Sequence, residues 1–393
     1  MFNIKYVLTL DIGGTNPRMA VVEVLGIDNY KIIEKRDINK EKDSIIEDIN
    51  NFLRDLGNKD ITTDVCCVSV AGPVDVAKNE CIHLVNAKFP IIGSEIEEKT
   101  ALKNVLVIND FRAIGEAVAT LNLDEKDDRI VQIPGYKDKD YSRKPDYYVK
   151  PDIYGNRAVI GPGTGLGIAY IVRTDSGYVL SASEGGHSGL PVHGDFTLLF
   201  HFLRNKLNVK HIDMEALVSG QGIRHIMDFF LTHQHAFLDL LASHPEFLSD
   251  FREYEKKVHK EIISDEEIRK ALIDEKENPL KVDAAKLIAT SIKKNPKARI
   301  TMRVFMIFLG SAAQDVALHG LSTGGLFLAG GILPKNEELL KNGDFIRAFY
   351  DNTRTIITDL LRKIPVYLVK DYDIPFYGCA RAAHLKFKDQ FLT

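Results

Sequence analysis

The chain has few cysteines, and their positions exclude two common uses of this residue. Only Cys66, Cys67, Cys81 and Cys379 occur among 393 residues. None belongs to a Cys-x-x-Cys pair, and no cysteine–histidine spacing typical of a zinc ligand set is present. The sequence therefore predicts neither a disulfide framework nor a zinc site, and it favours a reducing compartment.

Long apolar runs and an excess of basic charge are also missing. No stretch approaches the ~18–20 apolar residues that a membrane-spanning helix needs. Asp11 and the glycines after it interrupt the first apolar stretch, which is unlike a signal peptide. The formal net charge of −4 argues against nucleic acid as the main partner, because binding a phosphate backbone requires a basic surface. We expect a cytoplasmic protein that binds neither nucleic acid nor a membrane.

Three familiar nucleotide-binding signatures are absent as well. The chain contains no Gly-Lys dipeptide and hence no Walker A loop. The glycines at 161–167 do not fit Gly-x-Gly-x-x-Gly, and they lead into a predicted strand, which excludes a dinucleotide-binding Rossmann turn. The His-Arg-Asp and Asp-Phe-Gly signatures of protein kinases do not occur.

Two glycine-rich turns are present instead, each in the same setting. Asp11-Ile12-Gly13-Gly14-Thr15-Asn16-Pro17-Arg18 follows an apolar stretch, and so does Gly161-Pro162-Gly163-Thr164-Gly165-Leu166-Gly167. Each turn leads into a second predicted strand. Glycines allow positive φ and let backbone N–H groups approach an anion, and threonine adds a hydroxyl donor. The pair predicts two phosphate-binding hairpins in two related halves that close on a nucleotide.

Hydrophobic periodicity predicts a mixed sheet flanked by helices in each half. We expect strands at Tyr6–Asp11, Arg18–Val24, Tyr30–Arg36, Val65–Val70, Val105–Ile108, Leu326–Ala329 and Val366–Val369, and a strand, glycine turn and second strand over 158–173 (Ala158–Ile160 and Ile168–Arg173). We expect helices at 45–56, with a capping box made by Ser44 and Glu47, at Ile96–Leu102, at 111–121, and at Gly378–Lys388.

The length of the chain favours two domains over a single core. We expect residues 1–110 with 378–393 to form a small α/β domain, and residues 111–377 to form a larger one. Two insertions are expected in the larger domain. The segment 136–156 reads as an exposed loop, and 233–282 reads as a charged helical stretch whose histidines are solvated rather than metal-bound.

Six short motifs, in this order along the chain, resemble those of the glucokinase family within the sugar kinase, actin and Hsp70 superfamily. They are Leu10–Asn16, Ile108–Phe111, Gly163–Gly167, Glu184–His187, Glu215 with Ser219–Gly222, and Phe327–Gly331. The resemblance covers nearly the whole chain apart from the two insertions. It implies two ribonuclease-H-like domains of the actin-like ATPase type with a cleft between them, a homodimer, and ATP-dependent phosphorylation of glucose at its 6-hydroxyl to give glucose 6-phosphate and ADP.

Asp110 is the residue for which local sequence and resemblance differ most. It ends an apolar strand and begins a helix, so the local sequence alone favours a helix N-cap. The resemblance implies that Asp110 accepts the proton of the attacking sugar hydroxyl. With a reference pKa of about 3.9, an aspartate is ionised at neutral pH, and we expect it to be ready to act as a base.

The resemblance also assigns the nucleotide and its Mg²⁺. Asp11 is expected to hold the metal directly or through water, although a turn-capping aspartate is the alternative. Arg18 is either a phosphate ligand or an exposed strand residue. Gly330 and Gly331 are either the turn on the adenosine side or plain strand-ending glycines. The expected nucleotide site comprises Asp11, Gly13, Gly14, Thr15, Asn16, Arg18, Gly163, Thr164, Gly165, Gly330 and Gly331.

The expected sugar ligands are Asn86, Asn109, Asp110, Glu184, His187 and Glu215. A carboxylate can accept hydrogen bonds from two hydroxyls, and each hydrogen bond to a charged group contributes ~1.5–3 kcal/mol. For Glu184 and His187 a polar turn is the alternative, and for Glu215 a helix-surface acid. The residues after Asn86 depart from the family pattern.

Other functions on the same fold stay open at this point. A ROK-group amino-sugar kinase would usually carry a zinc-binding cysteine cluster after the sugar-binding histidine, and none follows His187. A kinase for another hexose, a non-catalytic sugar sensor and an Hsp70-like ATPase are the remaining alternatives. ADP or polyphosphate could replace ATP as the phosphoryl donor.

Overall fold

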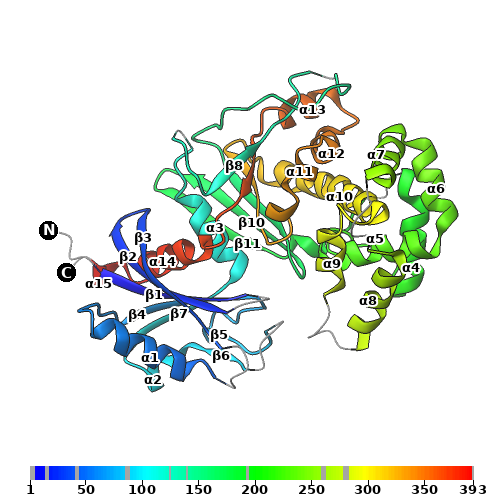
Figure 1. Cartoon of the computed structure of the whole chain (residues 1–393). Coiled ribbons are helices and arrows are strands. Elements are labelled where there is room, and N and C mark those ends of the chain that lie inside the picture. The colour runs from blue at the N-terminus through cyan, green and yellow to red at the C-terminus, as the bar shows by residue number, and fades with distance from the viewer. Residues whose placement is uncertain are drawn as a thin grey trace. The chain divides into compact units, whose positions relative to one another are not determined.

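The computed structural model describes residues 5–13, 17–39, 44–84, 89–123, 125–138, 140–191, 194–257, 263–277 and 283–391. The chain divides into two compact α/β units, each described by itself below (Figure 1). Unit 1 comprises Met1–Ile130, Ala169–Ala182 and Lys370–Thr393. Unit 2 comprises Val131–Ile168 and Ser183–Val369.

Unit 1 contains a five-stranded sheet of order β3-β2-β1-β4-β7. Its strands are β1 (Lys5–Ile12), β2 (Arg18–Gly26), β3 (Asn29–Asp37), β4 (Val65–Val70) and β7 (Asn104–Asn109), as the apolar runs predict. The neighbours β1, β4 and β7 are parallel, with Asp11 paired to Ser69 and Val70 paired to Asn109. The register therefore brings the carboxyl ends of these three strands to one edge.

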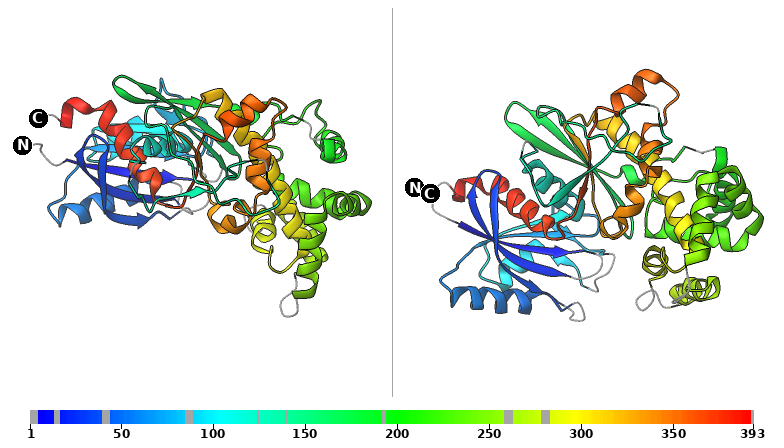
Figure 2. Two further views of the ribbon diagram at one scale, coloured as in Figure 1. Left: turned by 90° about the horizontal axis from the view of Figure 1, so that it is seen from above. Right: turned by 45° about the horizontal axis from the view of Figure 1, so that its top comes forward.

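Helices cover both faces of this sheet. On one face, α1 (Ile46–Gly57) and α2 (Gly93–Lys99) bury Ile49, Phe52 and Ile96 in a shared core. On the other, α14 (Ile374–Lys386) buries Phe376 and Cys379 against the sheet beside α3 (Asp110–Ala119) (Figures 1 and 2). Smaller elements are β5 (Glu80–Cys81), β6 (Ile91–Ile92) and α15 (Lys388–Phe391).

Three details of unit 1 differ from the sequence prediction. α14 begins at Ile374 rather than at Gly378, because Pro375 lies in the first turn, where a missing N–H leaves no bond unmade. α2 begins and ends three residues earlier than predicted. The capping box before α1 is wrong: the N-cap is Ile45, and Ser44 Oγ accepts a hydrogen bond from Ile46 N at 3.2 Å.

The second sheet has six strands in the order β11-β10-β9-β12-β13-β8. They are β8 (Ile130–Ile133), β9 (Arg157–Pro162), β10 (Leu166–Thr174), β11 (Gly177–Ser183), β12 (Gly325–Leu328) and β13 (Val366–Val369). In unit 2, β12 pairs in parallel with β9 and with β13. The sequence prediction missed β8 and β11.

The helices of unit 2 are α4 (Thr197–Leu207), α5 (Gly220–Thr232), α6 (Gln234–Ser243), α7 (Pro245–Lys257), α8 (Asp265–Glu277), α9 (Ala284–Thr290), α10 (Pro296–Gly320), α11 (Glu337–Leu340), α12 (Asp344–Tyr350) and α13 (Thr355–Leu361). The 25-residue α10 is long and apolar enough to cross a membrane. However, 83% of its most apolar window is buried inside the protein, as in the core helix of a soluble protein.

The two predicted insertions differ in outcome. Between β8 and β9 the described residues form no helix or strand, as predicted, but Tyr136 is only 2% exposed, so the expectation of an exposed loop is wrong there. The second insertion is helical, as predicted, and consists of α6, α7 and α8. His244 stacks on Phe247 in this segment rather than pointing into solvent, with ring centroids 5.2 Å apart.

Candidate functional site

Asp11 lies at the carboxyl end of β1 and is nearly buried. Its Oδ2 accepts a hydrogen bond from Arg18 Nη2 at 2.8 Å, and its Oδ1 accepts one from Ser69 Oγ at 3.2 Å. Burial raises the pKa of the Asp11 carboxyl, and the bond from Arg18 partly offsets that rise. Both of these partners are side chains; residues 14–16 of the turn lie outside the described part of the chain, so the turn-capping role stays an alternative.

Arg18 is held by several groups at once. Besides Asp11, its guanidinium donates to Asp373 Oδ1 at 2.7 Å and to the carbonyl oxygen of Tyr372 at 2.9 Å. It also lies 4.1 Å from the centre of the Tyr372 ring. The side chain is 11% exposed, so the alternative of an exposed strand residue is wrong. A phosphate bound by Arg18 would have to share the guanidinium with these partners.

Asn109, and not Asp110, caps α3. Asn109 Oδ1 accepts from Phe111 N at 2.9 Å and from Arg112 N at 3.4 Å, and its amide donates to the carbonyl of Gly72. Asp110 is the first residue of the helix, and its Oδ1 accepts a hydrogen bond from Phe111 N at 2.9 Å. The N-cap alternative for Asp110 is therefore wrong, because its neighbour has that role.

The protonation of Asp110 also differs from the sequence expectation. Burial, and then the negative charge of Asp11, raise the pKa of Asp110 to about 7. The expectation of a fully ionised carboxylate with the reference pKa was wrong because it ignored both effects. A carboxyl whose pKa lies near neutral pH can accept a proton and release it again, which is the property of a general base.

In unit 2, three backbone segments meet at the second glycine turn. Gly220 N, in the first turn of α5, donates to the carbonyl of Gly163 at 2.8 Å. Gly330, at the end of β12, has φ of +94°, and a Cβ atom there would lie 2.5 Å from the carbonyl oxygen of Pro162. Gly330 is thus required by close backbone packing. Thr164 and Gly331 are exposed at the same edge.

The candidate sugar ligands of unit 2 lie beside this turn. Glu215 Oε2 accepts from Leu166 N at 2.8 Å, and Glu215 N donates to the carbonyl of Gly186 at 2.9 Å. Glu215 precedes α5, so the alternative of a helix-surface acid is wrong. Glu184 and His187 are exposed at either end of a short 3₁₀ turn, Gly185–His187. Unit 2 therefore groups Glu184, His187 and Glu215 with the glycine turn.

Some candidate residues lie outside the described part of the chain: Gly14, Thr15, Asn16 and Asn86. Sequence reasoning also missed residues that hold the candidate side chains, among them Ser69 and Asp373 in unit 1 and Asp213 in unit 2. Only Ser69 carried a local signal, as a hydroxyl near the end of a buried strand beside β1. Asp373 lies 355 residues from Arg18, and no local pattern could connect them.

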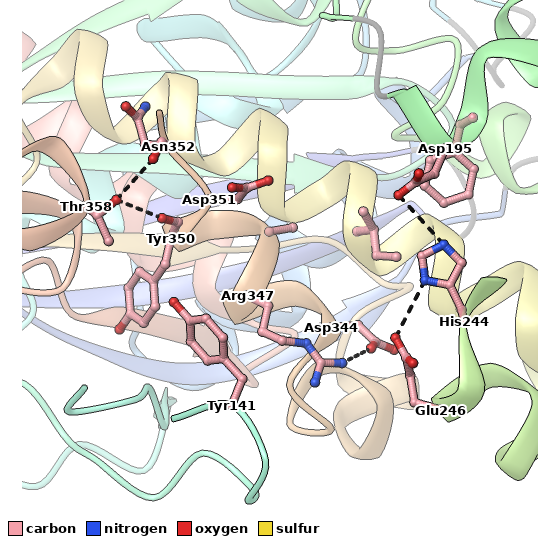
Figure 3. Close-up of a pocket in the computed structure, with 13 residues that line it drawn as sticks. Tyr141, Asp195, His244, Glu246, Asp344, Arg347, Tyr350, Asp351, Asn352 and Thr358 are labelled. Carbon is pink, nitrogen blue, oxygen red and sulfur yellow. Dashed lines mark hydrogen bonds and ion pairs between the residues drawn. The ribbon is translucent and has the colours of Figure 1, made fainter. Parts of the chain in front are cut away.

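A cavity of about 390 Å³ elsewhere in unit 2 contains none of these residues (Figure 3). It is lined by α10 and α12 and by Tyr141, Asp195, His244 and Glu246. Its polar groups largely bind one another: Arg347 pairs with Asp344 at 2.6 Å, and His244 lies 3.7 Å from both Asp195 and Glu246. We therefore assign no substrate to this cavity.

The mixed sheets flanked by helices define a protein of the actin-like ATPase fold, as predicted. The family model described as glucokinase matches residues 8–386. A glucokinase of Nostoc punctiforme is 26% identical over 377 residues, covering 95% of this chain and 97% of that protein. A glucokinase of Synechocystis sp. is 30% identical over 339 residues, covering 84% and 81%.

Solved structures agree. The crystal structure of glucokinase from an Antarctic psychrotroph matches with a TM-score of 0.68 and 26% identity, covering 98% of this chain and 100% of that one. A ROK family glucokinase from Streptomyces griseus, in complex with glucose and AMPPNP, has a TM-score of 0.52 at 16% identity, covering 97% and 99%, and shows the shared fold alone. The chain belongs to the glucokinase family.

Proposed function

We propose that this protein transfers the γ-phosphoryl group of ATP to the 6-hydroxyl of glucose, giving glucose 6-phosphate and ADP, with Asp110 as the general base. The observation that carries the proposal is the state of Asp110: Asn109 caps the helix in its place, and its pKa is raised to about 7. Membership of the glucokinase family supports the reaction. Glucose and AMPPNP in the Streptomyces griseus complex are the same pair of ligand types.

The proton and the phosphoryl group move in one balanced step. The sugar oxygen forms a bond to the γ-phosphorus while the bond between that phosphorus and the β,γ-bridging oxygen breaks, and ADP leaves. The hydroxyl proton passes to the Asp110 carboxylate. Asp110 is too weak a base to remove this proton beforehand, so the transfer comes late, as the hydroxyl becomes acidic on bonding to phosphorus. A positioned base contributes ~10²–10⁴-fold to the rate.

Asp11 is the residue we assign to Mg²⁺, directly or through water. The donor chemistry fits, because Mg²⁺ is usually bound through one or two carboxylates, with water and substrate phosphates as further ligands. Each Asp11 oxygen accepts one hydrogen bond from a described side chain and keeps a lone pair. A cation there would favour the ionised form that burial disfavours. When bound, Mg²⁺ would neutralise part of the negative charge of the phosphates.

The other residues divide between the two substrates. We assign glucose to Glu184, His187 and Glu215, together with Asn109 and Asn86, and we assign the nucleotide to the two glycine turns with Arg18, Gly330 and Gly331. Support comes from the grouping of Glu184, His187 and Glu215 with the second glycine turn in unit 2. We further propose a cytoplasmic homodimer, in keeping with the burial of α10 and with the family.

The variant Asp110→Asn tests the proposal. Asparagine keeps the size of the side chain but cannot accept the proton, so we expect kcat to fall by ~10²-fold or more while KM changes less. The measurement is a coupled assay of ADP release with glucose and ATP. Glu95→Gln is the matched control, because Glu95 is also an acid in the first turn of a unit 1 helix and should leave kcat unchanged. Near-normal turnover of Asp110→Asn would remove Asp110 from the chemistry.

The same assay on panels of sugars and donors separates the alternatives. Turnover confined to mannose, fructose or an amino sugar would indicate a different sugar kinase. Glucose binding without turnover would indicate a sensor, and ADP release without any sugar would indicate an ATPase. Turnover with ADP or polyphosphate in place of ATP would correct the donor.

A further inference from the structure

We propose that Asp213 is a positioning residue for His187. Its carboxylate accepts a hydrogen bond from Nδ1–H of the imidazole, which keeps the ring proton on Nδ1 and leaves Nε2 as a hydrogen-bond acceptor for a hydroxyl of the sugar. This inference rests on the proposed function, because it concerns how the proposed sugar site recognises the hydroxyl groups of its substrate. The two groups meet directly, with His187 Nδ1 lying 3.4 Å from Asp213 Oδ2. Both residues belong to unit 2.

The backbone fixes Asp213 opposite the histidine turn. Segments 186–190 and 212–215 run side by side, and Gly189 forms an antiparallel bridge with Asp213. Three backbone hydrogen bonds of 2.9 Å join them: Leu190 N to Ile212 O, Met214 N to Ser188 O, and Glu215 N to Gly186 O. The position of Asp213 is therefore set by main-chain hydrogen bonds and does not depend on its contact with the imidazole of His187.

The two oxygens of Asp213 have different partners. Oδ1 accepts a hydrogen bond from Ala216 N at 2.9 Å, which leaves Oδ2 to face His187. An ionised carboxylate can only accept hydrogen bonds, so the ring nitrogen facing it must carry a proton. In a neutral imidazole only one nitrogen is protonated, and Nε2 is then left with a free lone pair.

This arrangement has a consequence for which sugars can bind. Glu184 and Glu215 are acceptors when ionised, and His187 Nε2 becomes a third acceptor. The unit 2 part of the sugar site therefore offers acceptors to its ligand, and the ligand must supply the donors. Free hydroxyls satisfy this requirement. A fluorine or an O-methyl group at a hydroxyl that meets His187 does not, because neither carries a proton to donate.

The test uses Asp213→Asn, which should reverse the tautomer. Ala216 N–H must still meet an acceptor, so the amide oxygen takes the place of Oδ1 and the NH₂ group turns toward His187 Nδ1. Nδ1 then becomes the acceptor and the proton moves to Nε2. We expect the KM for glucose to rise about 10-fold with a smaller change in kcat, because a ligand hydroxyl would lose its acceptor. Nitrogen-15 NMR of His187 at pH 8.5 should show the reversed tautomer.

Asp283→Asn is the matched control. Asp283 Oδ1 accepts from Lys286 N at 2.8 Å, which is the same type of bond from the residue three positions ahead, but Asp283 is the N-cap of α9 and serves no candidate ligand. Asparagine is an equally good N-cap, so the KM of Asp283→Asn for glucose should stay at the wild-type value. A similar rise in KM for this control would overturn the proposal.

The wild-type protein gives a result that needs no variant. If NMR shows the proton of neutral His187 on Nε2, the proposal is overturned even where Asp213→Asn fails to fold. A reversed tautomer in Asp213→Asn with unchanged glucose KM would also overturn it. Absence of any glucose phosphorylation by the wild type would overturn the proposed function instead, and the NMR result would still decide whether Asp213 holds the Nδ1 proton.

Discussion

Asp110 acts as a base only when it is ionised, so its raised pKa predicts a pH dependence. Because burial and the charge of Asp11 place the pKa of Asp110 at about 7, lowering the pH below that value protonates the carboxyl and removes the base. We expect kcat/KM to fall ~10-fold per pH unit well below pH 7 and to level off above about pH 8.

A pH–rate profile from about pH 5 to pH 9, with ATP and glucose well below their KM values, checks this expectation, because kcat/KM then reports the free protein, in which the charge of Asp11 is not neutralised by a metal. The coupling enzymes must be in excess at every pH, and the thermal stability of the protein should be recorded alongside, so that unfolding is not read as lost activity. A profile that stays flat down to about pH 5 would contradict the role of Asp110, because the reference pKa of an aspartate lies lower still.

At the scale of residues, the sequence identified side chains better than it identified their surroundings. Short motifs were enough to name Asp110, His187 and Glu215 as candidates, and in unit 2 the structure groups the last two with the second glycine turn. The partners of Arg18 were not found, because Asp373 reaches it from the far end of the chain. The raised pKa of Asp110 could not be predicted from the sequence for a similar reason, because it depends on burial and on a charge that folding brings close.

Two helices of unit 1 pack so closely that one position admits only glycine. A Cβ atom on Gly378 of α14 would lie 1.7 Å from the carbonyl oxygen of Ala113 in α3. Gly378→Ala should therefore lower the free energy of unfolding by about 3 kcal/mol or more, because backbone atoms must move apart. Asp110 begins α3, so kcat should fall as well.

Gly57→Ala is the matched control for urea or thermal unfolding of this variant. Gly57 also lies in a helix of unit 1, α1, and a Cβ atom there meets nothing within 4 Å. Alanine should be neutral or stabilising by up to ~1 kcal/mol, because glycine costs conformational entropy in a helix. If Gly378→Ala were as stable as Gly57→Ala, the close packing of α3 and α14 would be wrong.

At the scale of elements, apolar runs predicted strands well because buried strands are read from local sequence alone. β4, for example, is buried at every position. The start of α14 was missed because Pro375 looks like a helix breaker, although proline is tolerated in the first turn of a helix. β11 was missed because its residues alternate less clearly.

At the scale of the whole molecule, unit 1 is assembled from three separate stretches of chain. The last of them carries α14, which covers one face of the β3-β2-β1-β4-β7 sheet with Phe376, Cys379 and Ala380. We expect a chain shortened to end at Val369 to lose solubility, because Val7, Val22 and Val65 lose their apolar cover. Hydrogen exchange of the β1 and β4 amides should also be faster.

A full-length variant serves as the control for this truncation. Leu385→Ala changes an exposed residue of α14, 46% accessible, and should leave solubility and exchange at the wild-type level. Slow exchange of β1 and β4 in the shortened chain would show that the sheet is stable without α14, in contradiction to the prediction.

The covering of an early sheet by a late helix has a consequence for how the protein is made. On a ribosome, β1 through β7 emerge long before α14, and at ~5–20 residues per second the delay is on the order of ten seconds to a minute. During that interval α3 is the only helix available for the face of the sheet that α14 covers in the described structure. The valine-rich part of this face that waits for α14 is then a binding surface for a chaperone, and the packing of the sheet is completed only after residues 374–386 have emerged.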